Sequence, residues 1–301
     1  MESQFVQLLL SLIFCLILNA CDHKQASTSF QSATWSAADF LETEYNSDGS
    51  IFTQCLAWEE PNVIWQNSGS NEQSILFKLM IRENSLILEN SWPIPDIFAE
   101  GCTPWGRFLL LLSWRSFTIH VFDKSSGQQV GVWPIATEGC GLSGSSQGLV
   151  YSDGSSVLRW ISSPLAWDRE SESALDVHKE ISIYDGQTPV FQLNELEWVE
   201  EFIFANVYPQ DRVALIDSQS GQVLAWLNLT PLLEQSSKRL AVNHKLTPGV
   251  ANGIAYDQKQ KLIWFTGKNW TKIYGLKATS LLSNLRSLKE KTGQSIPITS
   301  R

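Results

Sequence analysis

Apolar runs of strand length, separated by short polar turns, recur along most of this chain. Five segments share one plan, in which a strand, a polar turn and a second strand are often followed by a Ser-Gly-Gln-like turn and a third strand. These segments begin at Asn62, Arg107, Gly148, Glu201 and Lys261. Their starts lie roughly 40 to 60 residues apart, a spacing typical of β-propeller blades. The pattern predicts an all-β, five-bladed propeller over residues 39–280, whereas a β-sandwich would not explain five copies of one plan.

A propeller has to protect the edges of its first and last blades, because exposed strand edges pair readily with other chains. The usual solution pairs a strand from one terminus with the blade at the other end. Residues 40–47 are the candidate N-terminal strand, and residues 261–277 form the candidate last blade. We therefore expect a ring closed by N- and C-terminal strands. Five blades leave about 48 residues for each, whereas six would be shorter than the visible repeats.

A short and unusual stretch precedes each of the five strand pairs. The stretches are FTQC (52–55), FAEG (98–101), EGCG (138–141), NELEW (194–198) and NGIAYD (252–257). The innermost strands of a propeller converge on its axis, so residues at equivalent places in the repeats meet in space. The sequence therefore predicts one channel mouth, surrounded by Gln54, Glu100, Cys140, Asn194 and Asn252.

Three segments depart from the strand pattern. Ser162–Lys179 is acidic and lacks alternation, which predicts a long excursion between strands. Pro231–Leu240 has the composition of one short helix. Residues 281–301 begin with leucines at helical spacing, so we expect a C-terminal helix there that frays from Glu290 onward.

The N-terminus carries targeting information. Residues 1–20 contain an apolar run, Phe5–Leu18, that is short for a membrane span and suits a secretory signal peptide. Leu-Asn-Ala precedes Cys21, which resembles a bacterial lipoprotein signal, although Asn19 and the lack of Lys or Arg before the run depart from it. We expect an exported protein, periplasmic or membrane-anchored, with lipidated Cys21 and a polar tether over residues 21–38. Plain secretion and a retained signal anchor are the alternatives.

Composition narrows the class of partner. The 301 residues are 43% hydrophobic and 18% charged, which provides for a large core. The net charge of −9 argues against nucleic acid, because such a partner needs a basic face. We expect a monomer that contacts a membrane only through its lipid anchor.

Three cysteines remain after the N-terminal segment, namely Cys55, Cys102 and Cys140. Their number is odd, and none lies in a CxxC or CxH motif, so a disulfide framework and a zinc site both have little support. We expect three unpaired, buried thiols and no metal ligands among them.

The chain resembles the plant- and bacterial-type glutaminyl cyclases, which are five-bladed propellers. The resemblance covers about residues 50–277 and is carried by IFTQCLAW, FAEGCT, LLLLSW, SDGSSVLRWI, LNELEWVEEFIFANVY, DSQSGQVLAWLNL, NGIAYD and FTGKNW. The long NELEWVE-x-x-x-x-ANV and NGIAYD-x-x-x-x-x-x-x-x-TGK patterns are specific, whereas SGQV alone would carry nothing. The family implies cyclisation of N-terminal Gln to pyroglutamate with release of ammonia, and hence peptide or protein substrates.

The resemblance also implies roles for residues of the channel mouth. Glu100 matches the acidic residue and would move the proton, while Gln54 and Asn194 would hydrogen-bond the amide or the carbonyl that is attacked. Lys268 would stabilise negative charge or keep Glu100 ionised. The pocket wall would consist of Phe52, Phe98, Trp114, Cys140 and Tyr208. No cofactor is required for this chemistry, and a structural divalent cation in the channel is left open.

Several positions depart from the family pattern. Family members typically carry Gly at position 55, Leu at 102, Trp at 140 and 208, and Glu-Ser at 66–67. We expect activity with an altered pocket, and a non-catalytic peptide-binding propeller is the main rival. A hydrolase with a channel metal is the second rival, since Glu100, Asn194 and Asn252 could supply oxygen ligands; otherwise Asn252 is expected to hold a turn with Gly253. None of the four His lies in the site stretches, which argues against Ser-His or Cys-His catalysis.

Overall fold

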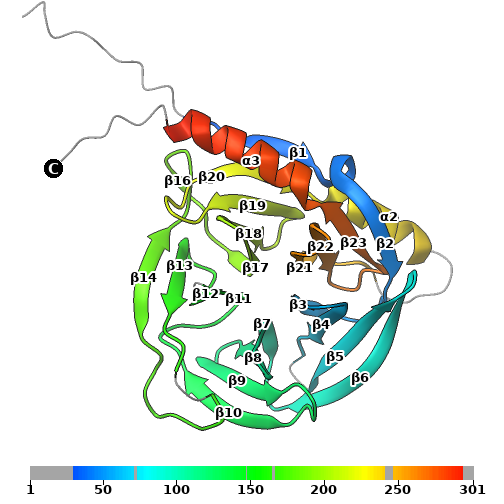
Figure 1. Ribbon diagram of the computed structural model, residues 1–301, viewed down its shortest axis with the longest axis vertical. Helices are drawn as coiled ribbons and strands as arrows, with labels where there is room; N and C mark the ends of the chain where they lie inside the picture. The colour runs from blue at the N-terminus through cyan, green and yellow to red at the C-terminus, as the bar shows by residue number, and fades with distance from the viewer. Residues whose placement is uncertain (1–29, 71–72, 147, 165–166, 241–246, 294–301) are drawn as a thin grey trace, which may run out of the picture. The chain divides into compact units, whose positions relative to one another are not determined.

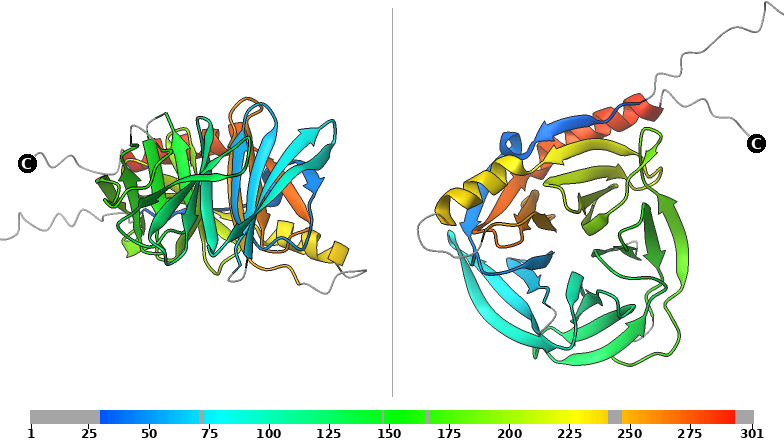
Figure 2. Two further views of the ribbon diagram at one scale, coloured as in Figure 1. Left: turned by 90° about the horizontal axis from the view of Figure 1, so that it is seen from below. Right: turned by 180° about the vertical axis from the view of Figure 1, so that it is seen from behind.

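The computed structural model describes residues 30–70, 73–146, 148–164, 167–240 and 247–293, which form five sheets around a central axis (Figure 1). Each sheet is one blade, and its strands step outward from the axis. Figure 2 shows the same ring from the side and from behind, and in the side view the strands run from one face of the ring toward the other. The predicted five-bladed, all-β propeller is confirmed.

The blades follow one another in sequence order. Blade 1 contains β3 (Thr53–Glu59), β4 (Val63–Ser68), β5 (Gln73–Arg82) and β6 (Ser85–Pro95). Blade 2 contains β7 (Ala99–Trp105), β8 (Phe108–Ser113), β9 (Thr118–Asp123) and β10 (Gln129–Pro134). Blade 3 contains β11 (Leu142–Ser145), β12 (Gly148–Ser152), β13 (Val157–Ile161) and β14 (Val177–Ser182). Blade 4 contains β17 (Leu193–Val199), β18 (Phe202–Val207), β19 (Arg212–Asp217) and β20 (Val223–Asn228). Blade 5 contains β21 (Ala251–Asp257), β22 (Leu262–Gly267) and β23 (Lys272–Lys277).

The innermost strands β3, β7, β11, β17 and β21 contact one another around the axis (Figure 1). Apolar side chains from the two faces of neighbouring blades meet between the blades, so the core is divided into inter-blade layers. For example, Trp65 of blade 1 packs in one layer with Leu111 of blade 2, while Ile64 packs with Trp264 of blade 5 on the opposite side. Because both faces of each blade are covered, inner strands such as β18 and β21 are buried along their whole length.

The N-terminal strand closes the ring. β2 (Leu41–Asn46) pairs antiparallel with β23, with Leu41 opposite Leu276 and Asn46 opposite Lys272. This pairing supplies the fourth strand of blade 5, as the predicted closure by residues 40–47 requires. The outer edge of β23 is therefore paired within the chain, and the N-terminal segment is held on the last blade.

The polar tether predicted over residues 21–38 is wrong for its last part. β1 (Ala33–Ser36) pairs in parallel with β20 and adds a fifth strand to blade 4, and η1 (Ala37–Phe40) follows it. Trp35 and Phe40 pack together with ring centroids 6.0 Å apart. A free strand edge on blade 4 accepts this polar segment through backbone pairing, which composition does not reveal. The predicted signal peptide, residues 1–20, and Cys21 lie outside the described residues.

Two helices lie on the outer side of blades 4 and 5. α2 (Thr230–Leu240) matches the predicted short helix. α3 (Ala278–Gly293) buries Leu281, Leu282 and Leu285. Fraying was expected from Glu290, but the helix continues to Gly293, and residues 294–301 lie outside the described part. No helix among the described residues combines the length and apolarity that a membrane span requires.

The excursion predicted at Ser162–Lys179 is present between β13 and β14, although its last three residues belong to β14. One further hairpin, formed by β15 (Tyr184–Asp185) and β16 (Thr188–Pro189), connects blades 3 and 4.

The prediction of three unpaired thiols is wrong for two of them. Cys55 of β3 and Cys102 of β7 form a disulfide, with their Cα atoms 5.6 Å apart. The two residues are 47 positions apart in sequence but occupy neighbouring inner strands, so the fold brings them together. An odd count of three is also compatible with one disulfide and one free thiol, which is the arrangement observed, with Cys140 unpaired.

Two carboxyl groups of β17 lie inside the ring, Glu195 completely buried and Glu197 partly buried. Glu195 accepts hydrogen bonds from the backbone N–H groups of Leu56 (3.4 Å) and Ile254 (3.0 Å), and so connects blade 4 to blades 1 and 5. Glu197 accepts a hydrogen bond of 2.9 Å from Ser143 Oγ of blade 3. Burial raises the pKa of both groups, that of Glu197 to about 8.

We expect these carboxyls to make stability fall with rising pH. The unfolded chain loses the Glu197 proton near pH 4.5 while the folded chain keeps it to about pH 8. The stabilising contribution is therefore complete below pH 4.5 and is lost as the pH rises through about 8. Glu197→Gln should flatten the decline in unfolding free energy between pH 5 and pH 9, measured by denaturant titration. An unchanged decline in the variant would contradict this assignment.

Candidate active site

A pocket opens where the inner strands converge, with a volume of about 360 Å³. It is lined by Phe52, Gln54, Phe98, Glu100, Trp114, Cys140, Gly154, Gln192, Leu193, Asn194, Tyr208 and Lys268. Nine of the ten residues that the sequence placed at the channel mouth and its wall are in this list, and the tenth, Asn252, lies buried behind the lining. Gly154, Gln192 and Leu193 were not among the predicted residues. Gly154 lies in the turn after β12, and Gln192 and Leu193 stand directly before Asn194, where β17 begins.

A chain of three side-chain amides runs across the pocket floor and ends on Glu100. Asn194 Nδ2 donates to Asn252 Oδ1 (2.9 Å), and Asn252 Nδ2 donates to Gln54 Oε1 (2.8 Å). Gln54 Nε2 then donates to Glu100 Oε1 (3.1 Å). These four residues come from four different blade strands, β17, β21, β3 and β7. The amide chain therefore fixes the relative positions of the inner strands at the point where a substrate would enter.

One backbone contact fixes the direction of this amide chain. Asn252 Nδ2 also donates to the carbonyl oxygen of Thr53 (3.1 Å), and a carbonyl can only accept. The Asn252 amide nitrogen therefore points toward blade 1. Gln54 must then accept from it with Oε1, which leaves Gln54 Nε2 to donate to Glu100. In the same way Asn194 uses its nitrogen, so its oxygen is left as an acceptor at the pocket surface.

The sequence placed Asn252 at the channel mouth and expected it to hold a turn with Gly253, and the turn is wrong. Asn252 lies within β21, is completely buried, and connects Asn194 to Gln54. The signal for its role was its place in NGIAYD, which is equivalent to the other four inner-strand stretches. Asn67 was also missed, and its Nδ2 donates to the backbone oxygen of Glu100 (2.7 Å).

We expect Asn252→Asp to lower kcat/KM for an N-terminal Gln peptide about tenfold, since one hydrogen bond is worth about 1–1.5 kcal/mol. An ionised carboxylate has no donor for Gln54 Oε1, so Gln54 should turn its nitrogen toward position 252 and its oxygen toward Glu100. Asn206→Asp is the matched control, because Asn206 Oδ1 accepts from Gly253 N (3.1 Å) outside the pocket. Equal kcat/KM values in both variants would show that the amide chain does not position Glu100.

The buried side chains of Glu100 and Lys268 shift each other's pKa. Burial raises the pKa of Glu100 to about 8, and the positive charge of Lys268 limits this rise. Burial in turn lowers the pKa of Lys268, while Glu100 opposes that shift. Glu100 is thus able both to accept and to release a proton near neutral pH.

Lys268 is held at the pocket rim by aromatic rings. Its Nζ lies 4.5 Å from the ring centroid of Phe52 and 5.2 Å from that of Tyr208. The backbone of Lys268 forms a β-bridge with Phe52, which joins blade 5 to blade 1 beside the pocket. None of the described carboxylates lies within ion-pair distance of the Lys268 ammonium group. The positive charge of Lys268 therefore acts on the contents of the pocket.

Another part of the pocket wall is a packed aromatic pair. Phe98 and Trp114 meet edge to face, with centroids 5.2 Å apart. Gly69 lies against this pair, and a Cβ at that position would come within 2.5 Å of Phe98 and 2.6 Å of Gln54. Glycine is therefore required there for the wall and the amide chain to lie side by side.

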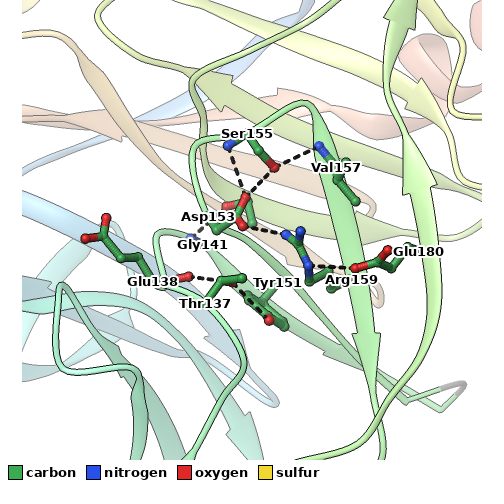
Figure 3. Close-up of polar contacts among 10 residues, drawn as sticks. Thr137, Glu138, Gly141, Tyr151, Asp153, Ser155, Val157, Arg159 and Glu180 are labelled. Carbon is green, nitrogen blue, oxygen red and sulfur yellow. Dashed lines mark hydrogen bonds and ion pairs between the residues drawn. The ribbon is translucent and has the colours of Figure 1, made fainter.

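Blade 3 contributes Cys140 and a braced turn to the wall. Asp153 Oδ1 accepts hydrogen bonds from Ser155, and Asp153 Oδ2 forms an ion pair with Arg159, so the turn that carries Gly154 is fixed (Figure 3). Gly154 has a φ of +80°, and a Cβ there would lie 4.0 Å from Cys140 Sγ. Burial raises the pKa of the Cys140 thiol, so this group stays protonated and is a poor nucleophile.

Among the described residues, no group of three or more His, Cys, Asp or Glu side chains is arranged to hold a metal ion. Of the oxygen ligands considered for a channel metal, Asn252 Oδ1 is occupied by Asn194, and Glu100 Oε1 by Gln54.

Comparisons with known proteins show the family of this chain. The family model described as glutamine cyclotransferase matches residues 12–278. A glutaminyl-peptide cyclotransferase of Arabidopsis thaliana is 30% identical over 236 residues, which cover 78% of this chain and 69% of the relative. The crystal structure of Myxococcus xanthus glutaminyl cyclase has the same fold, with a TM-score of 0.64, 24% identity, and coverage of 78% of this chain and 94% of that one. This chain therefore belongs to the glutamine cyclotransferase family.

Proposed function

We propose that this protein converts the N-terminal Gln of peptides or proteins to pyroglutamate and releases ammonia. The observation that supports this proposal best is the amide chain that ends on Glu100 inside a small pocket with aromatic walls. The reaction needs a group that moves a proton, donors for a developing oxyanion, and a wall that folds the flexible Gln side chain. The pocket offers all three.

The α-amino group of the substrate must lose a proton before it attacks. Its pKa is about 7.7–8.0, close to that of Glu100 at about 8, so proton transfer between them is nearly balanced. The acceptor oxygen of Asn194 and the carboxylate of Glu100 would hold the amine. The α-nitrogen then forms a bond with the side-chain amide carbon, and the proton passes through Glu100 to the departing nitrogen, which leaves as ammonia.

The tetrahedral intermediate carries negative charge on the former amide oxygen. Gln54 Nε2 has a second N–H beyond the one given to Glu100, and Lys268 supplies a desolvated ammonium at the rim. One donor of this kind is worth about 3–4 kcal/mol in the transition state. Phe98 and Trp114 would press the substrate side chain into the shape of a five-membered ring, which supplies orientation.

The test uses residues 22–301 and a short peptide that begins with Gln, with ammonia release and peptide mass followed over time. Loss of one ammonia per peptide is expected. The same peptide with an acetylated α-amine is the control and should not react, because its nucleophile is blocked. Binding of the free peptide without turnover would instead establish a non-catalytic binding propeller.

We also propose an extracytoplasmic location with a lipid on Cys21, supported by the sequence of residues 1–21 alone. Mass spectrometry of the N-terminal peptide from membranes of a bacterial host would detect the lipid, and Cys21→Ser should abolish it. An unmodified N-terminus at Cys21 or beyond would contradict the proposal.

A further inference from the structure

A second cavity lies on blade 4, at the same end of the blade as the pocket mouth. Its volume is about 220 Å³, and it is lined by Thr34, Gln210, Asp211, Arg212, Trp226, Asn228 and Thr230. The hairpin that joins β18 to β19 connects the two cavities, since Tyr208 lines the first while Gln210 and Arg212 line the second. The strand register agrees, because Val207 pairs with Leu193 of the pocket and Arg212 pairs with Asn228.

Arg212 is the notable group of this cavity. Its guanidinium carbon lies 3.7 Å from the ring centroid of Trp226, and its buried Nε has no hydrogen-bond partner in the part of the chain that the structure describes. Burial lowers the pKa of Arg212, although Asp185 opposes the shift. Asp185 Oδ2 accepts from the ring nitrogen of Trp226 (2.8 Å). A partly desolvated guanidinium that lacks an acceptor favours an incoming anion.

The lining also indicates the kind of anion. A guanidinium stacked on an aromatic ring keeps the edge formed by its two Nη groups available, and that edge matches a carboxylate with two parallel hydrogen bonds. Asp211 lines the same cavity, and its Oδ1 accepts from Ala251 N (2.9 Å). Its negative charge disfavours a free, multiply charged anion such as phosphate. A peptide avoids this conflict, because it brings backbone N–H groups for Asp211 together with a carboxylate for Arg212.

Because the cavity adjoins the pocket, we propose that the Arg212 cavity binds a carboxylate of the peptide substrate, a few residues after its N-terminal Gln. This inference rests on the proposed cyclase function and adds a substrate preference to it. Neighbouring strands lie about 4.8 Å apart, so the two or three spacings from β17 to β19 and β20 amount to about 10–14 Å. An extended peptide covers about 3.3 Å per residue. The carboxylate should therefore belong to residue four or five, counting Gln as the first.

The test compares amidated hexapeptides that begin with Gln and carry alanine elsewhere, with one Glu placed at each position from two to six. Peptides with Gln in place of that Glu are the neutral controls. We expect kcat/KM to be about tenfold higher for Glu than for its control at position four or five, as one charge-assisted hydrogen bond allows. Arg212→Gln should remove this preference and leave turnover of the neutral peptides unchanged.

A matched variant distinguishes the effect of the cavity from that of an Arg–Trp contact alone. Arg169 is exposed and stacks on Trp133, with its guanidinium carbon 5.0 Å from the ring centroid, and it lines neither cavity. Arg169→Gln should therefore keep the parent's preference. A tetrapeptide with a free C-terminus, compared with its amide, shows whether a terminal carboxylate is also accepted, and an advantage lost in Arg212→Gln would support the same site.

The outcomes distinguish this inference from the function on which it rests. Turnover of neutral peptides with equal kcat/KM for Glu and Gln at every position would overturn the carboxylate site and leave the cyclase function standing. A preference that persists in Arg212→Gln would overturn it as well. If no peptide is cyclised, the proposed function fails and this inference fails with it.

Discussion

Replacing Glu100 by Gln is expected to lower kcat/KM for N-terminal Gln peptides by about 10²–10⁴-fold, the usual contribution of a general acid–base group. The substitution keeps the shape of the side chain and an oxygen for Gln54 Nε2, so the pocket should stay assembled. Ammonia release measures the loss. Glu195→Gln is the control, because Glu195 is a buried carboxyl of the same channel that does not line the pocket. A rate equal to the parent's in Glu100→Gln would exclude Glu100 from the chemistry.

The pH dependence of the parent enzyme follows from the same group. The pKa of Glu100 is about 8 and that of the substrate amine about 7.7–8.0, and one proton has to be shared between them. Below this range both are protonated and no nucleophile is present, while above it no acid is left for the departing nitrogen. We expect a bell-shaped profile of kcat/KM centred near pH 8. Lys268→Met removes the charge that limits the pKa of Glu100, so the bell should move to higher pH.

Loss of the Cys55–Cys102 disulfide is expected to lower the unfolding free energy by about 4 kcal/mol, the value that loop entropy gives for a separation of 47 residues. Cys55→Ala with Cys102→Ala, compared with the parent by denaturant titration, measures this change. Reduction with dithiothreitol should lower the unfolding free energy of the parent by the same amount. The same treatment should leave the unfolding free energy of the double variant unchanged. Equal stability of parent and double variant would show that the disulfide does not constrain the unfolded chain.

The same disulfide lies beside Glu100 and Gln54, the two residues to which we assign the proton transfer and the oxyanion contact. Cys55 follows Gln54 on β3, and Cys102 is two residues after Glu100 on β7, so one covalent bond and one hydrogen bond join the same two strands. The two family departures at positions 55 and 102 are therefore a matched pair. Cys55→Gly with Cys102→Leu introduces the residues expected of the family, and it should retain activity with a stability between those of the parent and the alanine double variant.

The sequence predicted those features that depend on repetition. Five copies of one strand plan determined the number of blades, and equivalent positions in the copies brought Gln54, Glu100 and Asn194 to one pocket. Ring closure followed from the need to satisfy two strand edges. Each of these conclusions uses spacing along the chain, which is visible without coordinates.

Other features depend on which atoms face each other across blades, and spacing does not contain this information. Gly101 and Gly141 are examples, because a Cβ on Gly101 would meet the backbone of Leu142 at 2.4 Å, and one on Gly141 the backbone of Asn194 at 2.3 Å. The sequence showed the glycines but not the contact between inner strands that requires them. The disulfide and the Asn252 link are hidden for the same reason, since both join strands of different blades.

Two contacts that complete the ring join segments far apart in the chain, so they can form only after the last blade has been synthesised. β2 pairs within blade 5 with β23, more than 200 residues later in the chain, and Phe52 of the pocket forms a β-bridge with Lys268 between blades 1 and 5. Contacts of such long separation form late, because much chain entropy has to be lost first. A nascent chain that ends before blade 5 therefore has neither a closed ring nor a complete rim. Enzymatic activity in this protein reports that the last blade has been made and docked.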